Sequence, residues 1–187
     1  MELSERPDED RNNRDIVLPA VKSNGNALQY ASTNLQNDRE VVMTAIRSDG
    51  SALKFASATL RNNRDFVLAA ISLNISALQY ASYDLRNDKN IVSAAAKFDG
   101  TALYYASENL RNDRGIVMDA ASSDASSLQF ASFDLQNDRY FMLDAVRSNG
   151  SALQYASISL RSNRDFVLAA VTINASSFCG ASACWLQ

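Results

Sequence analysis

Apolar residues recur along the chain at helical spacing. In the segment 63–72, "NRDFVLAAIS", they are spaced i, i+1, i+4 and i+5. That spacing is one face of an amphipathic helix and not the alternation of a strand. The segment therefore predicts a helix whose buried face consists of Phe66, Val67, Ala70 and Ile71.

A second, shorter helix is expected after each such segment. The string "ALQYAS" occurs at 27–32, 77–82 and 152–157, and the corresponding residues Ala52, Leu53, Ala56 and Leu60 share one helical face. Between the two helices, the segment "SDGS" (48–51) predicts the end of the first helix, a turn and the N-cap of the second helix. Gly50 is free to take positive φ in this turn. Asn62 with Asp65 resembles a capping box at the start of the next first helix.

The pattern returns every 25 residues. With Asn13 as repeat position one, seven repeats follow without a gap, preceded by an acidic N-terminal extension at residues 1–12. A fixed period of this size is typical of stacked supersecondary repeats. The repeats span 13–37, 38–62, 63–87, 88–112, 113–137, 138–162 and 163–187.

Short helices of this kind need neighbours. An isolated helix under about 12 residues is marginal in water, whereas stacked hairpins bury a continuous core. We therefore expect one all-α repeat domain over 13–187, an α-solenoid of seven helical hairpins wound as a right-handed superhelix. The ends depart from the pattern, with Pro19 inside the first helix and Trp185 in the last repeat.

The recurring pattern "ALQYASxxLRNDRxxVxxAxxxxG" resembles the repeats collected as domain of unknown function 4116, over essentially the whole chain after residue 12. The resemblance implies tandem helical repeats. Such repeats occur in proteins of protists and of intracellular bacteria, including candidate translocated effectors. It implies no catalytic residue and no cofactor, and it raises delivery into a host cell as one localisation.

Composition and charge narrow the choice of partners. The net charge of −3 and the pI near 5.0 argue against nucleic acid or an anionic membrane surface as the main partner. No apolar run approaches the roughly 20 residues of a membrane-spanning helix, and the acidic start does not resemble a secretory signal. With two cysteines, a reducing, cytoplasmic setting is expected.

Residues for catalysis or metal binding are scarce. The chain has no histidine, and it shows no phosphate-binding loop or calcium-loop spacing. Cys179 and Cys184 do not align on one helical face, so we interpret them as structural or incidental thiols. Asn74 and Asn174 match a glycosylation triplet but are better explained as turn residues. We expect no enzyme activity, no metal and no cofactor.

Repeat position two is always basic. A cation in the first helical turn is disfavoured by the helix dipole, so a compensating partner is needed. We favour an ion pair or an aromatic contact within the repeat or with the next one; the alternative is a row of phosphate contacts to nucleic acid. The residues are Arg14, Arg39, Arg64, Lys89, Arg114, Arg139 and Arg164.

Variable positions on the outer faces suggest a binding surface. Large apolar side chains at positions predicted to face water are candidates for an interface, and aromatic residues often anchor protein contacts. The alternative is that they pack against the neighbouring repeat. The candidates are Tyr83, Phe133 and Ile158 at position twenty-one, Tyr104 at position seventeen and Tyr140 at position three.

These observations favour a non-catalytic scaffold that binds another protein, with a bacterial effector or its regulator as the setting that the resemblance implies. The alternative is a nucleic-acid-binding repeat that uses the basic ladder, which predicts binding that falls steeply with salt. Self-association through the end that carries Trp185 also stays open, because an uncapped solenoid end exposes its core.

Overall fold

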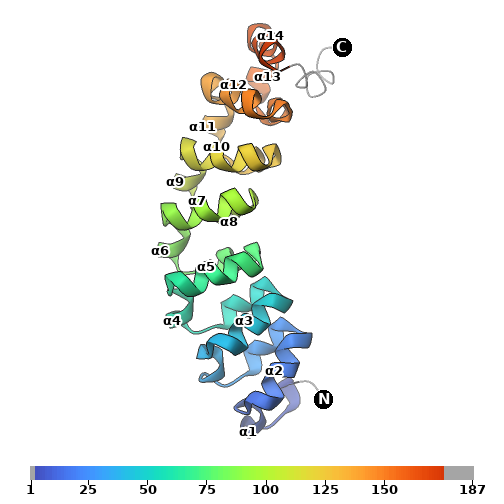
Figure 1. Cartoon of the computed structure of the whole chain (residues 1–187), viewed down its shortest axis with the longest axis vertical. Coiled ribbons are helices and arrows are strands. Elements are labelled where there is room, and N and C mark those ends of the chain that lie inside the picture. The colour runs from blue at the N-terminus through green and yellow to red at the C-terminus, as the bar shows by residue number, and fades with distance from the viewer. Residues whose placement is uncertain (1–2, 175–187) are drawn as a thin grey trace. The chain divides into compact units, whose positions relative to one another are not determined.

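The computed structural model describes residues 3–174 and divides into two compact parts. One part ends at Ile91 and the other begins at Val92, so the boundary falls within helix α7 (Lys89–Phe98). All regular elements in the described residues are helices, as expected for an all-α repeat protein (Figure 1).

Every repeat begins with a ten-residue α-helix, and in the first six repeats this helix is followed by a short 3-10 or α segment and by one further helical turn. In the N-terminal part these elements are α2 (Arg14–Ser23), η2 (Gly25–Tyr30) and η3 (Leu35–Asn37); α3 (Arg39–Ser48), η4 (Gly50–Phe55) and α4 (Ala58–Arg61); α5 (Arg64–Leu73), η5 (Ile75–Tyr80) and α6 (Tyr83–Arg86).

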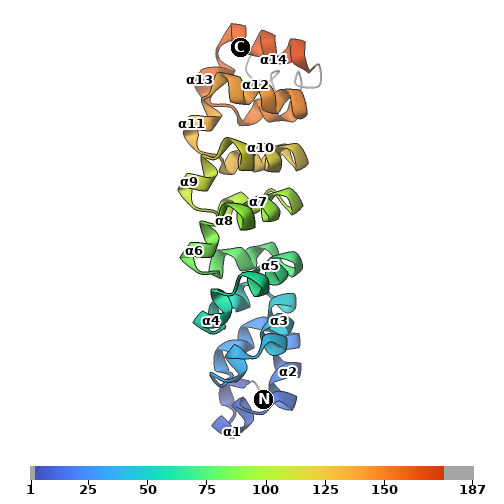
Figure 2. The same ribbon diagram turned by 60° about the vertical axis from the view of Figure 1, so that its left-hand side comes forward.

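The C-terminal part follows the same order. After α7 come α8 (Ala102–Tyr105) and α9 (Glu108–Arg111); α10 (Arg114–Ser123), η6 (Ala125–Phe130) and α11 (Phe133–Gln136); α12 (Arg139–Ser148), η7 (Gly150–Tyr155) and α13 (Ile158–Arg161); and α14 (Arg164–Ile173). Its one-turn helices α9, α11 and α13 lie along one edge of this part (Figure 2).

The predicted apolar faces form the core. Phe66, Val67 and Ala70 are fully buried and Ile71 is 4% exposed, which confirms the face predicted for the first helix. The second predicted set is buried as well, because its apolar residues also meet the neighbouring repeats. Its members Ala52, Leu53, Ala56 and Leu60 are each at most 5% exposed.

The expectation of one continuous second helix is wrong. The segment Gly50–Phe55 is a 3-10 helix, and the chain then becomes extended at Ala56, with φ −69° and ψ 157°. A new helical turn begins after Ser57, whose hydroxyl accepts a hydrogen bond from the N–H of Leu60. Serine at this position favours an N-cap over a helix interior, and the bond of its hydroxyl to Asn37 of the preceding repeat holds the break in place.

Two details of the predicted caps are also corrected. The N-cap of α5 is Asn63 and not Asn62, since the Asn63 side chain accepts from the N–H of Phe66. Gly50 does not take positive φ, and the turn is capped instead by Asp49, which accepts from the N–H of Ser51. A Cβ on Gly50 would collide with the Asn74 and Ser76 side chains, so glycine here allows close approach of the next repeat.

The segment expected to be an N-terminal extension continues the repeat pattern. Helix α1 (Asp8–Arg11) occupies the position that a one-turn helix has in the later repeats. Leu3, in η1 (Leu3–Glu5), is buried, as are Leu28 and Leu53, which follow it at intervals of 25 residues. Pro19 lies inside α2, and the helix continues through it to Ser23.

Candidate functional site

Serine N-caps begin the one-turn helices α11 and α13 and fix which of their side chains face water. In α11 the hydroxyl of Ser132 accepts from the N–H of Leu135, and Leu135 is then 4% exposed. The first residue of the turn, Phe133, projects outward and is 69% exposed. The same geometry leaves Ile158, at the start of α13, 75% exposed.

The other predicted anchors are exposed too, on different elements. Tyr83 begins α6 in the N-terminal part and is 67% exposed. Tyr104, on α8, is 60% exposed and meets the ring of Phe130 edge-on with the ring centroids 5.5 Å apart. Tyr140, on α12, is 76% exposed and does not line the groove described next.

Phe133 and Ile158 line one groove in the C-terminal part. The groove has a volume of about 360 Å³ and lies where the one-turn helices of two successive repeats meet. Its other lining residues are contributed by the same two repeats, mostly through side chains of the 3-10 segments and the one-turn helices. They are Gln129, Gln136, Gln154, Tyr155, Ala156, Ser157 and Arg161. We call it the Phe133–Ile158 groove.

Equivalent hollows occur between other repeats. One is lined by Glu108, Arg111 and residues 131–134, and another by Asp8, Arg11 and residues 29–33. In each, the last residue of a one-turn helix faces the start of the next one. The groove is therefore a property of the repeat, and its side chains vary from repeat to repeat.

Arginines of the basic ladder at position two make contacts with the next repeat. Arg64 lies 2.6 Å from the Asp88 carboxylate, and Arg114 pairs with Asp138 in the same way. The guanidinium can also stack on a ring of the next repeat, as Arg39 does over Phe66 with 5.0 Å to the ring centroid. Further contacts of this ladder are those of Arg14 with Asp38 and Glu40, and of Arg139 with the Phe166 ring and the Asp165 carbonyl.

A second series of hydrogen-bonding residues, at repeat position twenty-four, was missed. The signal was present in the sequence, because this position holds arginine or glutamine at every 25-residue step from Arg11 to Arg161. Nε of Arg161 donates to the carbonyl of Ala156 at 3.0 Å, and Nε2 of Gln136 donates to that of Leu128 at 2.8 Å. The members are Arg11, Gln36, Arg61, Arg86, Arg111, Gln136 and Arg161.

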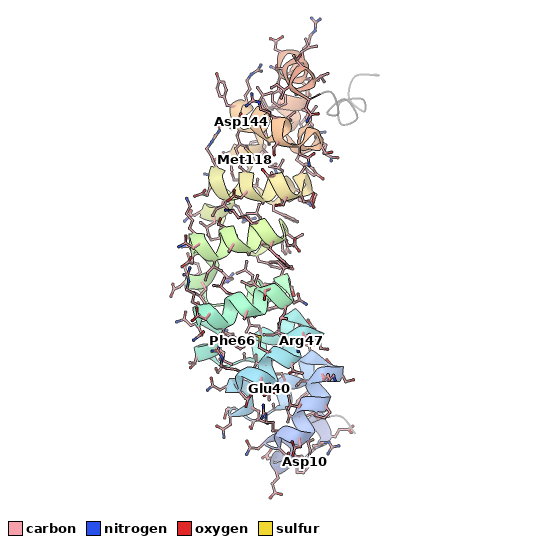
Figure 3. All side chains as sticks on the ribbon, in the orientation of Figure 1. Asp10, Glu40, Arg47, Phe66, Met118 and Asp144 are labelled. Carbon is pink, nitrogen blue, oxygen red and sulfur yellow. The ribbon has the colours of Figure 1, made fainter. Side chains whose placement is uncertain are left out.

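Further exposed apolar side chains were not predicted. Phe98, the last residue of α7, is 72% exposed, and Leu168 on α14 is 55% exposed. In the N-terminal part, α2 and α3 border a hollow of about 660 Å³ that includes Lys22 and Arg47; Arg47 lies on α3 (Figure 3).

The remaining sequence predictions concern the glycosylation triplets, the two cysteines and metal binding. Asn74 caps η5, since its Oδ1 accepts from the N–H of Ser76. Cys179, Cys184 and Trp185 lie outside the described residues, as does most of the second glycosylation triplet. Within residues 3–174, no three Cys, Asp or Glu side chains come together in a way that could hold a metal ion.

Fold and sequence together define an all-α tandem-repeat protein. The chain belongs to the family described as domain of unknown function (DUF4116), whose model matches residues 7–36, 38–86, 63–110, 88–136 and 138–182. Neither the curated proteins nor the solved structures contain a significant match to the chain. Within the described part of the chain, no helix has the length and apolar character needed to cross a membrane.

Proposed function

We propose that the chain is a non-catalytic scaffold that binds another protein through the Phe133–Ile158 groove. One observation carries the proposal: two large apolar side chains from successive repeats stand 69% and 75% exposed on the rim of the same groove. Exposed apolar groups gathered at one place are typical of an interaction site.

The hydrogen bonds of the backbone around the groove support this role. Phe133 and Ile158 each follow a serine N-cap, and the N–H of Ser157 donates to the carbonyl of Gln136 at 2.8 Å, which joins the two one-turn helices. A surface held in place before binding loses little conformational entropy, so a few anchors suffice for affinity. In keeping with the candidate effectors that carry such repeats, we propose a partner in a cytosol.

The test is proximity crosslinking in lysate, with the crosslinker placed at Gln154 on the groove. The natural chain is compared with Phe133→Ala/Ile158→Ala, in which both side chains become the alanine that occupies this repeat position at Ala58. The control is Leu168→Ala, which removes another exposed apolar group, on α14. All variants must show the same helical circular dichroism.

We expect a crosslinked protein that persists in the control and is lost in the double variant. A crosslink pattern that is the same in all three proteins would contradict binding through the groove. Crosslinking to nucleic acid whose yield falls when the reaction is run at higher salt would favour a nucleic-acid-binding repeat.

A further inference from the structure

We infer that the Phe133–Ile158 groove accepts a peptide segment that carries a large apolar side chain beside a carboxylate. The apolar side chain lies between Phe133 and Ile158, and the carboxylate pairs with Arg161. The inference rests on the proposed function and narrows the partner to one chemical class.

The charge of Arg161 has no counterpart in the described protein. Its Nε is fixed by the Ala156 carbonyl, which leaves the terminal nitrogens of the guanidinium without a hydrogen bond or ion pair among residues 3–174. Arg64 and Arg114, at position two, have carboxylate partners instead. A half-buried guanidinium beside apolar groups favours a carboxylate ligand, because charge-assisted bidentate bonds strengthen where water is excluded.

The lining of the groove complements such a segment. Among residues 3–174, Arg161 is the one charged residue that lines the groove, and Phe133, Ile158 and Tyr155 form apolar walls. Gln129 and Gln154 add amide groups that can bond to a peptide backbone. The volume of about 360 Å³ is small for a ligand pocket and suits a short segment of chain.

The equivalent hollows lack this complementarity. The hollow at Arg111 also contains Glu108 and Asp134. In the hollow at Arg11, that arginine lies 3.5 Å from Asp8. Acidic side chains there repel a carboxylate or already neutralise the arginine. The preference for an acidic segment therefore distinguishes the groove between repeats 5 and 6 from these two hollows.

A peptide explains the groove better than nucleic acid does. Tracking a phosphate backbone takes several cations and stacking rings, whereas this groove has a single arginine and an aliphatic wall at Ile158. The preceding one-turn helix also carries Asp134, and the net charge of the chain is −3. Both oppose an extended polyanion more than they oppose a single carboxylate.

The repeats themselves provide a matched substitution. Gln36 and Gln136 occupy the position of Arg161, and each donates through Nε2 to a carbonyl of the preceding 3-10 segment. Arg161→Gln therefore removes the positive charge while keeping a side chain that the fold already accepts. Its helical circular dichroism and thermal midpoint should equal those of the natural chain.

The experiment is selection of a displayed random peptide library on the complete chain and, in parallel, on Phe133→Ala/Ile158→Ala. A peptide enriched on the natural chain is then synthesised with a fluorescent label. A second version has each Asp or Glu replaced by Asn or Gln. Fluorescence anisotropy measures the affinity of both peptides for the natural chain and for Arg161→Gln.

We expect enriched peptides to share a large apolar residue within two positions of Asp or Glu. Arg161→Gln should weaken the acidic peptide by about tenfold or more. The neutral peptide should bind both proteins equally, because the lost interaction involves its missing carboxylate. Arg147→Gln, which removes an exposed arginine paired with Asp144 on α12, should change neither affinity.

The other outcomes separate this inference from the proposed function. Peptides that require Phe133 and Ile158 but bind equally well to Arg161→Gln would overturn the acidic partner and leave a protein-binding groove. A library that shows no enrichment over the double variant would overturn both. A labelled single-stranded RNA that binds the natural chain and not Arg161→Gln would assign the groove to nucleic acid.

Discussion

The hydroxyl of Ser157 donates a hydrogen bond of 2.6 Å to Oδ1 of Asn137, twenty residues earlier in the chain. The same hydroxyl accepts from the N–H of Leu160 and so begins α13. One small side chain thus caps a helix and joins two repeats. Corresponding bonds link Ser32 to Asn12, Ser57 to Asn37, Ser82 to Asn62 and Ser132 to Asn112.

Loss of one such serine should destabilise the fold. Ser132→Ala removes both the cap of α11 and the bond to Asn112, and we expect a loss of about 1–2 kcal/mol in the free energy of unfolding. Urea unfolding followed by circular dichroism measures it. The control Ser72→Ala, at an exposed site where the hydroxyl bonds only to its own helix, should change stability by less than about 0.5 kcal/mol. Equal effects of the two substitutions would contradict the dual role.

Two glycine substitutions should act in opposite directions. A Cβ on Gly25 would overlap the backbone oxygen of Ala45 in the next repeat, so Gly25→Ala should cost about 1–3 kcal/mol. At Gly115, in the first turn of α10, an added methyl group would have only the Asp113 carboxylate close to it, at 3.3 Å. Gly115→Ala should be neutral or stabilise by up to about 1 kcal/mol. Thermal unfolding measures the change in stability of both variants. A stabilised Gly25→Ala would contradict the close approach of Gly25 to the Ala45 backbone oxygen.

The stability of the fold should depend on Asp88 and Asp138 in acid. The N–H of Ile91 and then Arg64 hold the pKa of the Asp88 carboxyl below its usual value, and the N–H of Phe141 and then Arg114 do the same for Asp138. A lowered folded-state pKa means that this stabilisation is complete above the unfolded-state pKa of about 3.9. It is lost as the pH falls through the folded-state pKa.

Asparagine at these positions separates the cap from the charge. Asn63 shows that asparagine can accept the capping bond, but it does not titrate. Asp88→Asn/Asp138→Asn should lower stability at neutral pH by about 0.2–1 kcal/mol per site, because the ion pairs are partly exposed. The thermal midpoint should then fall less between about pH 5 and pH 3 than in the natural chain. Melting curves that shift in parallel at every pH would count against this account.

The position-two ladder should contribute to stability in a salt-dependent way. Arg114→Gln removes an ion pair with Asp138 and a contact with the Phe141 ring, 5.2 Å from its centroid. We expect a loss of about 0.5–1.5 kcal/mol that shrinks in high salt. Arg147→Gln, which breaks an exposed pair within α12, should cost less than about 0.5 kcal/mol. Chemical denaturation in urea at two salt concentrations provides the measurement.

Part of the candidate site could be predicted from single positions in the repeat. Phe133 and Ile158 share position twenty-one and were predicted to face outward; they do, although the serine N-cap of a separate one-turn helix and not a continuous second helix places them there. The groove between them could not be predicted, because it depends on how two repeats pack. The role that we propose for Arg161 was missed for a related reason: that it has no carboxylate partner among residues 3–174 becomes visible only in the folded structure.

The sequence by itself determined the 25-residue period, the helical class and the buried faces. These follow from local spacing, since the same apolar pattern recurs in each repeat and must be buried in each. Tertiary structure decided where the second helix breaks at Ala56, which arginines are paired and where grooves open. Those outcomes depend on contacts between residues 20 to 26 positions apart, such as Ser157 with Asn137, that no helical period can specify.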